Sequence, residues 1–170
     1  GRFNPPTVGH VKLVNRIVNI AREVSGEPLV YLSHSDDNKK NPIKYSDKLL
    51  YAKLAFGDIV KASRARTLIQ VLQELEKKYD DVIFVVGSDR AQEMSKLLER
   101  YNGKDYNFDN IKVVSAGERD PDADGIAGMS ASKAREFAKC DDYSRFKKCL
   151  PPTLQKQARK IYTTVRKNLK

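Results

Sequence analysis

A short apolar run at residues 82–86 limits the possible folds of this chain more than any other feature. Five residues are too few to cross a membrane, which takes about 20, but they suit a strand covered on both faces. The run ends at Gly87, and a helix is predicted from there to about Tyr101. Similar signals recur along the chain, with strands predicted at 28–33, 59–62 and 111–115 and helices over about 7–25, 46–55, 66–79 and 153–168. Strands that alternate with helices predict an α/β fold with a doubly wound parallel sheet.

The length and the charge distribution set the domain organisation. A chain of 170 residues has room for one domain of ordinary size, and we predict a single domain with a basic helical region at 133–170. That region holds twelve lysines and arginines against three acidic residues, a net charge of +9 out of +10 for the whole chain. A basic surface attracts nucleic acid or a polyphosphate ligand, but a solvated helix face has the same composition. The sequence leaves the oligomeric state open.

The cysteines and histidines argue against a metal centre. Cys140 and Cys149 are nine positions apart and fit no zinc or redox spacing, and His10 and His34 are the only histidines. We therefore predict no Cys/His metal site. Two isolated cysteines, no apolar leader and no membrane span favour the cytoplasm.

The first ten residues carry the strongest functional signal. Asn4-Pro5-Pro6 predicts a tight loop, and a helix is expected to begin at about Thr7. Thr7, Gly9 and His10 would then lie at a helix N-terminus, where free N–H groups and the helix dipole favour an anion. The alternative is a proline-rich turn with an incidental capping threonine and a surface histidine.

Two motifs give the chain a family resemblance. Thr7-Val8-Gly9-His10 resembles the T/HxGH motif of the nucleotidyltransferase superfamily, and the residues before it resemble the GRFxP lead-in of archaeal-type nicotinamide-nucleotide adenylyltransferases. The threonine is similar to the variant in phosphopantetheine adenylyltransferases. Ser130-Ala131-Ser132-Lys133-Ala134-Arg135 resembles the second signature, SxSxxR. The opening and this signature together also resemble nucleotidyltransferase-like proteins of tailed bacteriophages.

The resemblance implies a Rossmann-like nucleotidyltransferase fold. In that superfamily a buried central strand precedes the GRFxP loop, whereas this sequence begins at the loop itself. A sheet without that strand leaves its two neighbours unpaired. We therefore expect residues upstream of Gly1 in the natural protein.

The reaction implied is attack by an acceptor phosphate on the α-phosphate of ATP, with release of pyrophosphate and with Mg²⁺ carried on the triphosphate. By resemblance, His10 stabilises the transition state, Thr7 orients the acceptor or the triphosphate, and Gly9 lets the adenosine pack closely. The resemblance also implies phosphate contacts by Arg135 and by Lys44, with Lys39 and Lys40 as competitors of Lys44. It implies nucleotide contacts by a further set of residues: Arg2, Phe3, Asn4, Ser130 and Ser132.

Three further segments have open interpretations. Gly87 and Asp89 resemble the GxD turn that holds the nucleotide or the acceptor, although Asp89 could equally be a helix N-cap. The acidic stretch at 120–124 is interpreted as a solvated loop rather than a metal site. His34 follows a predicted strand and lies near the acceptor or simply in a loop.

Ser46 is the predicted cap of one helix, and Ser130 or Ser132 is the predicted cap of another.

The acceptor and the nucleotide are predicted from the same motifs. The lead-in favours nicotinamide mononucleotide as the acceptor, and the threonine favours phosphopantetheine. CTP ranks behind ATP because Gly128-Met129-Ser130-Ala131-Ser132 lacks the Arg-Thr-Glu part of the RTEGxST-like signature that cytidylyltransferases usually show. A different class of function is a non-catalytic basic module that binds nucleic acid or a virion on the same fold.

Overall fold

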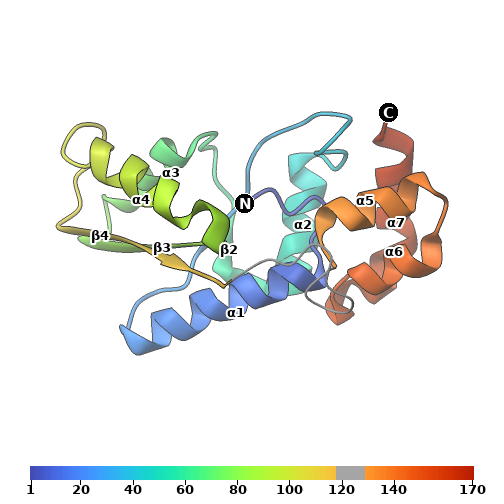
Figure 1. Cartoon of the computed structure of the whole chain (residues 1–170), viewed down its shortest axis with the longest axis horizontal. Helices are drawn as coiled ribbons and strands as arrows, with labels where there is room; N and C mark the ends of the chain where they lie inside the picture. Colours follow the sequence, from blue (N-terminus) through green and yellow to red (C-terminus); the bar gives the residue numbers. More distant parts are fainter. Residues whose placement is uncertain (118–128) are drawn as a thin grey trace. The chain divides into compact units, whose positions relative to one another are not determined.

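The computed structural model describes residues 1–117 and 129–170. The chain divides into two compact units (Figure 1). The first unit comprises residues 1–62 and 120–170, and the second comprises residues 63–119. The prediction of one domain over residues 1–170 stays a prediction.

The first unit contains a short parallel strand pair and most of the helices. Its elements in chain order are α1 (Val8–Glu23), β1 (Val30–Tyr31), α2 (Tyr45–Phe56), η1 (Gly57–Ile59), β2 (Val60–Lys61), α5 (Ala131–Lys139), α6 (Tyr143–Cys149), η3 (Pro152–Gln157) and α7 (Ala158–Asn168). Val30 of β1 lies opposite Val60 of β2. Gly1 also lies along β1, because its amino group donates to the Tyr31 carbonyl at 2.7 Å and its carbonyl accepts from the Ser33 amide at 2.8 Å.

Two apolar clusters hold the first unit together. One joins the opening loop, α1 and the strand pair through Phe3, Val14, Val30, Leu32, Ala52 and Val60. The other joins α2 to α5, α6, η3 and α7, which lie together in the orange-to-red part of Figure 1. Ile161 and Val165 of α7 are completely buried in it. The C-terminal helices are therefore part of the core and not an appended basic tail.

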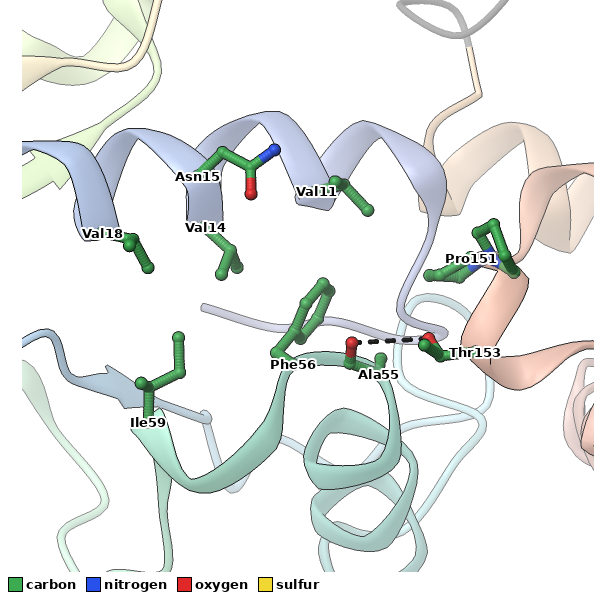
Figure 2. Close-up of a pocket in the computed structure, with 10 residues that line it drawn as sticks. Val11, Val14, Asn15, Val18, Ala55, Phe56, Ile59, Pro151 and Thr153 are labelled. Atoms are coloured by element: carbon green, nitrogen blue, oxygen red, sulfur yellow. Dashed lines mark hydrogen bonds between the residues drawn. The ribbon is translucent and has the colours of Figure 1, made fainter.

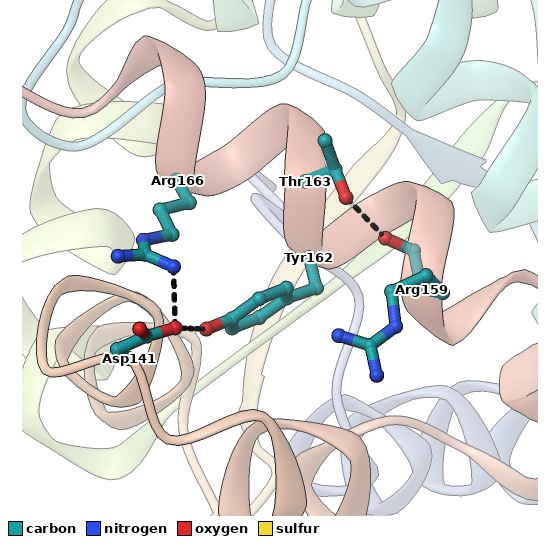
Figure 3. A network of polar contacts seen from close by, with 5 residues as sticks. All are labelled: Asp141, Arg159, Tyr162, Thr163 and Arg166. Atoms are coloured by element: carbon teal, nitrogen blue, oxygen red, sulfur yellow. Dashed lines mark hydrogen bonds and ion pairs between the residues drawn. The ribbon is translucent and has the colours of Figure 1, made fainter.

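A polar network fastens α7 to the turn after α5. The Tyr162 hydroxyl donates to Asp141 Oδ1 at 2.5 Å, and Arg166 forms an ion pair with the same oxygen (Figure 3). The hydrogen bond from Tyr162, followed by the charge of Arg166, keeps the pKa of Asp141 below its usual range, while the same bond raises the pKa of Tyr162. Arg159 lies over the Tyr143 ring, 3.6 Å from its centre. These contacts connect α7 to α6 and to the end of α5.

The second unit is a parallel strand pair covered by two helices. Its elements are α3 (Leu68–Leu75), β3 (Asp81–Val86), α4 (Ser88–Tyr101) and β4 (Asn110–Ser115). The pair runs in register from Asp81 opposite Asn110 to Val86 opposite Ser115. Leu72 of α3 and Leu98 of α4 are buried with Tyr106 and Phe108 against the strands.

The fold prediction is confirmed in type. Helices and strands alternate, and both strand pairs are parallel, as in a Rossmann-like nucleotidyltransferase fold. In the part of the chain that the structure describes, no helix is long and apolar enough to cross a membrane.

Several local predictions are wrong. Ser46 does not cap α2, because Lys44 occupies the cap position, and Asp89 lies in the first turn of α4 after the cap residue Gly87. The helix predicted at 66–79 stops at Leu75, whose carbonyl accepts hydrogen bonds from two following turn amides. Apolar residues of β3 are only half-buried, because among the described residues β3 pairs with β4 alone.

Candidate functional site

The start of α1 fixes the orientation of a histidine ring. Thr7 is the N-cap residue, and its backbone N–H donates to His10 Nδ1 at 2.9 Å. Because Nδ1 accepts this bond, the proton of the neutral ring is on Nε2, which makes that nitrogen a donor. The Thr7 hydroxyl lies 3.2 Å from the same Nδ1, and the Phe3 ring packs 4.4 Å from the imidazole, centre to centre. Thr7 and Phe3 therefore hold His10 in one orientation.

The residues before α5 lie directly against the start of α1. The Gly9 amide donates to the Met129 carbonyl at 3.3 Å, and a Cβ atom at Gly9 would lie only 3.1 Å from that oxygen. Glycine is thus needed here for close backbone packing. Ser130 caps α5 by accepting from the Lys133 amide at 3.2 Å. The two sequence motifs, 120 residues apart in the sequence, are adjacent in the first unit.

A buried asparagine connects three segments of this site. Asn4 is completely buried, its Nδ2 donates to the Ile43 carbonyl at 2.9 Å, and its Oδ1 accepts from the Ile43 amide at 2.9 Å. The Asn4 backbone carbonyl accepts from Arg135 Nη1 at 2.9 Å. Nη2 of the same arginine donates to the Ser132 hydroxyl at 3.1 Å. Asn4 therefore sets where Arg135 lies.

Three cationic side chains are grouped in the same region. Lys48 is completely buried, and its ammonium donates to the Ser33 carbonyl at 2.6 Å. Burial, followed by the positive charge of Arg2, lowers the pKa of Lys48 to about 8. Burial and then Arg2 also lower the pKa of Arg135. The repulsion of both groups by Arg2 is unfavourable by itself and favours binding of an anion.

Two carboxylates of the loop after β1 partly offset this charge. The negative charge of Asp36 raises the pKa of Lys48, and the negative charge of Asp37 raises the pKa of Arg135, so each partly offsets the lowering by burial and by Arg2. Asp37 itself accepts hydrogen bonds from the amides of Lys39 and Lys40 at 2.9 and 2.6 Å, which hold its pKa well below the usual range. The loop and the cationic group are thus in electrostatic contact.

A comparison with models of protein families identifies the family to which this chain belongs. A family model described as cytidylyltransferase-like matches residues 1–137, which contain both motifs. The chain belongs to the cytidylyltransferase-like family. Comparisons with curated proteins and with solved structures found no match. Membership in this family supports nucleotidyl transfer as the general activity.

The structure shows what several predicted site residues contact within the first unit. Thr7 is completely buried and orients His10, and its predicted contact with the acceptor or the triphosphate stays a prediction. Phe3 is a core residue beside His10 and Phe56, and Asn4 is a buried link between backbone segments. Their predicted contacts with the nucleotide stay predictions. Gly9 accommodates the Met129 backbone, and its predicted close packing against adenosine stays a prediction.

Other predicted residues of this family member remain at the surface or in the second unit. Lys44 is exposed at the residue before α2, and Lys39 and Lys40 are exposed in the loop after β1. Gly87 and Asp89 belong to the second unit, at the carboxyl end of β3, where their predicted ligand contacts stay predictions. The acidic stretch at 120–124 lies outside the described residues.

Lys48 is the site residue that sequence analysis missed. The NPxK-like pattern directed attention to Lys44, but a lysine before a helix is free to extend into solvent. Lys48 lies three and four residues before Tyr51 and Ala52, which are buried on the core side of α2. This helical spacing places Lys48 on the buried face of α2. The spacing is the sequence signal from which a buried lysine could have been predicted.

An aromatic pair and an apolar pocket complete the surroundings. His34 stacks on Tyr45 with ring centres 3.7 Å apart, next to Ser33, which binds Lys48. A separate pocket of about 360 Å³ lies between α1 and the end of α2 (Figure 2). The described residues that line it are uncharged, as shown by Val14 and Phe56, which point into it. It therefore lacks the cations that a triphosphate needs.

Replacing Asn4 tests the link between the segments. Asn4→Ala leaves the Ile43 N–H and carbonyl buried without their partners, and we expect a loss of about 2 kcal/mol or more in the free energy of unfolding. Urea unfolding followed by circular dichroism measures it. Asn19→Ala, at an exposed position of α1, is the matched control and should change stability by less than about 0.5 kcal/mol. Equal effects of the two variants would contradict the role of Asn4.

Proposed function

We propose that the protein transfers AMP from ATP to a small phosphorylated acceptor and releases pyrophosphate. The observation that carries the proposal is the group of three cations, Arg2, Lys48 and Arg135, in the same unit as the oriented His10. A triphosphate supplies the negative charge that this group lacks. Family membership supports nucleotidyl transfer in general, and the choice of ATP and of the acceptor is our proposal.

The reaction needs positioning and charge stabilisation more than a reactive side chain. An oxygen of the acceptor phosphate attacks the α-phosphorus of ATP, and the bond between the α-phosphorus and the bridging oxygen to the β-phosphate breaks. Pyrophosphate leaves with the electron pair. His10 donates from Nε2 to an α-phosphate oxygen, where negative charge builds up in the transition state. The Thr7 N–H keeps the proton on that nitrogen by occupying Nδ1.

The cations bind the two phosphates that leave. Arg135 is held by Asn4 and Ser132, so its guanidinium is oriented before the ligand arrives. Arg2 and the buried Lys48 add positive charge in the same unit. Lys44 is proposed only as a peripheral attraction for phosphate, because it is exposed.

Magnesium enters this proposal as part of the substrate. Mg²⁺ keeps several waters and binds phosphate oxygens readily. In the ranges 1–117 and 129–170, no group of three or more His, Cys, Asp or Glu side chains is placed to hold a metal ion. The ion is proposed to arrive on the triphosphate.

We propose nicotinamide mononucleotide as the first acceptor to test. The GRFxP-like opening supports it, and the half-buried stack of His34 on Tyr45 offers an aromatic surface beside the cationic group for a planar ring. Phosphopantetheine is the next acceptor. CTP is the alternative nucleotide, and turnover with CTP alone would replace ATP in the proposal.

Substrate turnover tests the reaction directly. Pyrophosphate release is measured with ATP or CTP against nicotinamide mononucleotide, nicotinate mononucleotide, phosphopantetheine and glycerol 3-phosphate. We expect release with ATP and one acceptor, and a fall of at least about 100-fold in His10→Asn, which keeps an acceptor for the Thr7 N–H but loses the Nε2 donor. Asn19→Ala should leave the rate unchanged. Absence of nucleotide binding by calorimetry would rule out the proposed function.

The buried lysine predicts how ATP affinity depends on pH. Below pH 8 the free protein carries a charged Lys48, and above it the ammonium loses its proton. ATP affinity should therefore fall as pH rises from about 7 to 9.5, by up to about tenfold, because the site loses one positive charge. Calorimetry at each pH measures it.

Two variants separate Lys48 from its neighbour in this experiment. Lys48→Arg stays charged and should remove the decline. Lys44→Arg should retain the decline, because Lys44 is exposed. A flat profile in the wild-type protein would contradict an electrostatic contribution of Lys48 to phosphate binding.

A second candidate function is binding of nucleic acid by the basic helices. All ten lysines and arginines of residues 138–170 are exposed, and the two acids of that region, Asp141 and Asp142, are each paired with an arginine. Deleting 153–170 would not test this candidate, because Leu154, Ile161 and Val165 are core residues. Surface charge reversal is the appropriate change.

The nucleic-acid candidate predicts a salt-dependent complex. Lys148→Glu with Lys160→Glu should weaken binding of an oligonucleotide by about tenfold or more and reduce the slope of affinity against salt concentration. The control is Lys77→Glu with Lys78→Glu, two exposed lysines of the second unit with the same change in charge. Fluorescence anisotropy at several salt concentrations measures both. Equal weakening by the two pairs would exclude a specific role of the basic helices.

A further inference from the structure

We infer that the C-terminal end of α7 positions the phosphate site, with Asn168 as the positioning residue. The inference rests on the proposed function, since it concerns the same cationic group. It assigns a role to a part of the chain that follows the family match, which ends at residue 137. Three hydrogen-bonded links lead from Asn168 to Arg135: Asn168 to Pro42, Ile43 to Asn4, and Asn4 to Arg135.

The first contacts join α7 to the loop after β1. Asn168 Nδ2 donates to the Pro42 carbonyl at 2.8 Å, and the Lys170 amide donates to the Asn38 carbonyl at 3.1 Å. The helix that supplies these donors is itself fixed, because Ile161 and Val165 are completely buried. The loop is therefore attached to a rigid part of the core.

The loop transmits this attachment because it is ordered internally. The Asp37 carboxylate accepts from the amides of Lys39, Lys40 and Asn41, and its second oxygen accepts from Asn41 Nδ2 at 2.6 Å. Asn41 and Ile43 are buried. Residues 37–43 thus form one compact turn, and a shift of the Pro42 carbonyl moves the whole turn.

The last contacts lead from the turn to the cationic group. Ile43 exchanges two hydrogen bonds with the Asn4 side chain, and the Asn4 carbonyl holds Arg135. The same turn carries Asp37, whose charge acts on Arg135. A displaced turn would therefore alter both the support and the counter-charge of Arg135.

The test compares two side chains of α7 that each make one hydrogen bond. Asn168→Ala removes the bond to the loop. Thr163→Ala removes a bond from the Thr163 hydroxyl to Arg159 of the same helix, at an exposed position. We expect Asn168→Ala to raise the Kd for ATP about fivefold, the equivalent of one ordinary hydrogen bond, and Thr163→Ala to leave it unchanged.

Two further measurements distinguish positioning from general destabilisation. In an Arg135→Ala background, Asn168→Ala should cause no further loss of ATP affinity, because the effect passes through Arg135. Hydrogen exchange should become faster at the amides of Lys39, Lys40 and Asn41, and stay unchanged at Ala134, whose amide bonds to Ser130 within the capped start of α5.

Each outcome decides the inference. Additive losses in the double variant, or equal behaviour of Asn168→Ala and Thr163→Ala, would overturn it. If the wild-type protein binds neither ATP nor CTP, the proposed function fails and the loop has no phosphate site to serve. In that case the exchange experiment still reports whether Asn168 orders the loop, so the two failures are distinguishable.

Discussion

The hydrogen bonds of one buried asparagine determine how the first unit is assembled around its site. An amide side chain pairs with both the N–H and the carbonyl of Ile43, which only a short side chain with a donor and an acceptor can do. Asp at this position would lack the donor, and Gln would be one carbon too long. The Asn4 backbone carbonyl also accepts a hydrogen bond from Arg135. The opening loop, the loop after β1 and α5 therefore meet at a single residue.

The buried ammonium of Lys48 is unfavourable for stability, and it supports our proposal that the first unit binds an anion. A charge removed from water costs free energy unless an opposite charge compensates it, and Lys48 has a carbonyl as its close partner and Arg2 as a repelling neighbour. Leucine or methionine would fill the same space at lower cost. Unfavourable electrostatics of this kind is typical of functional sites, where the incoming ligand supplies the missing charge.

Much of the fold could be predicted from local patterns, whereas the site could be predicted only in part. The bounds of β3 and the cap at Ser130 follow from apolar runs and capping chemistry that act within a few residues. The motifs identified His10 and Arg135, which lie in one unit. They could not separate Lys44 from Lys48, because burial of a lysine depends on which face of α2 meets the core, and that is set by distant residues.

The C-terminal helices show why charge alone is a poor guide to the organisation of this chain. The excess of lysine and arginine suggests an appended basic tail, and the family match ends before it. Yet α7 has Ile161, Tyr162 and Val165 at helical spacing on one face, and this face is buried while the cations occupy the other. Because the same helix reaches the loop after β1 through Asn168, a basic surface and a structural support for the site coexist in one element.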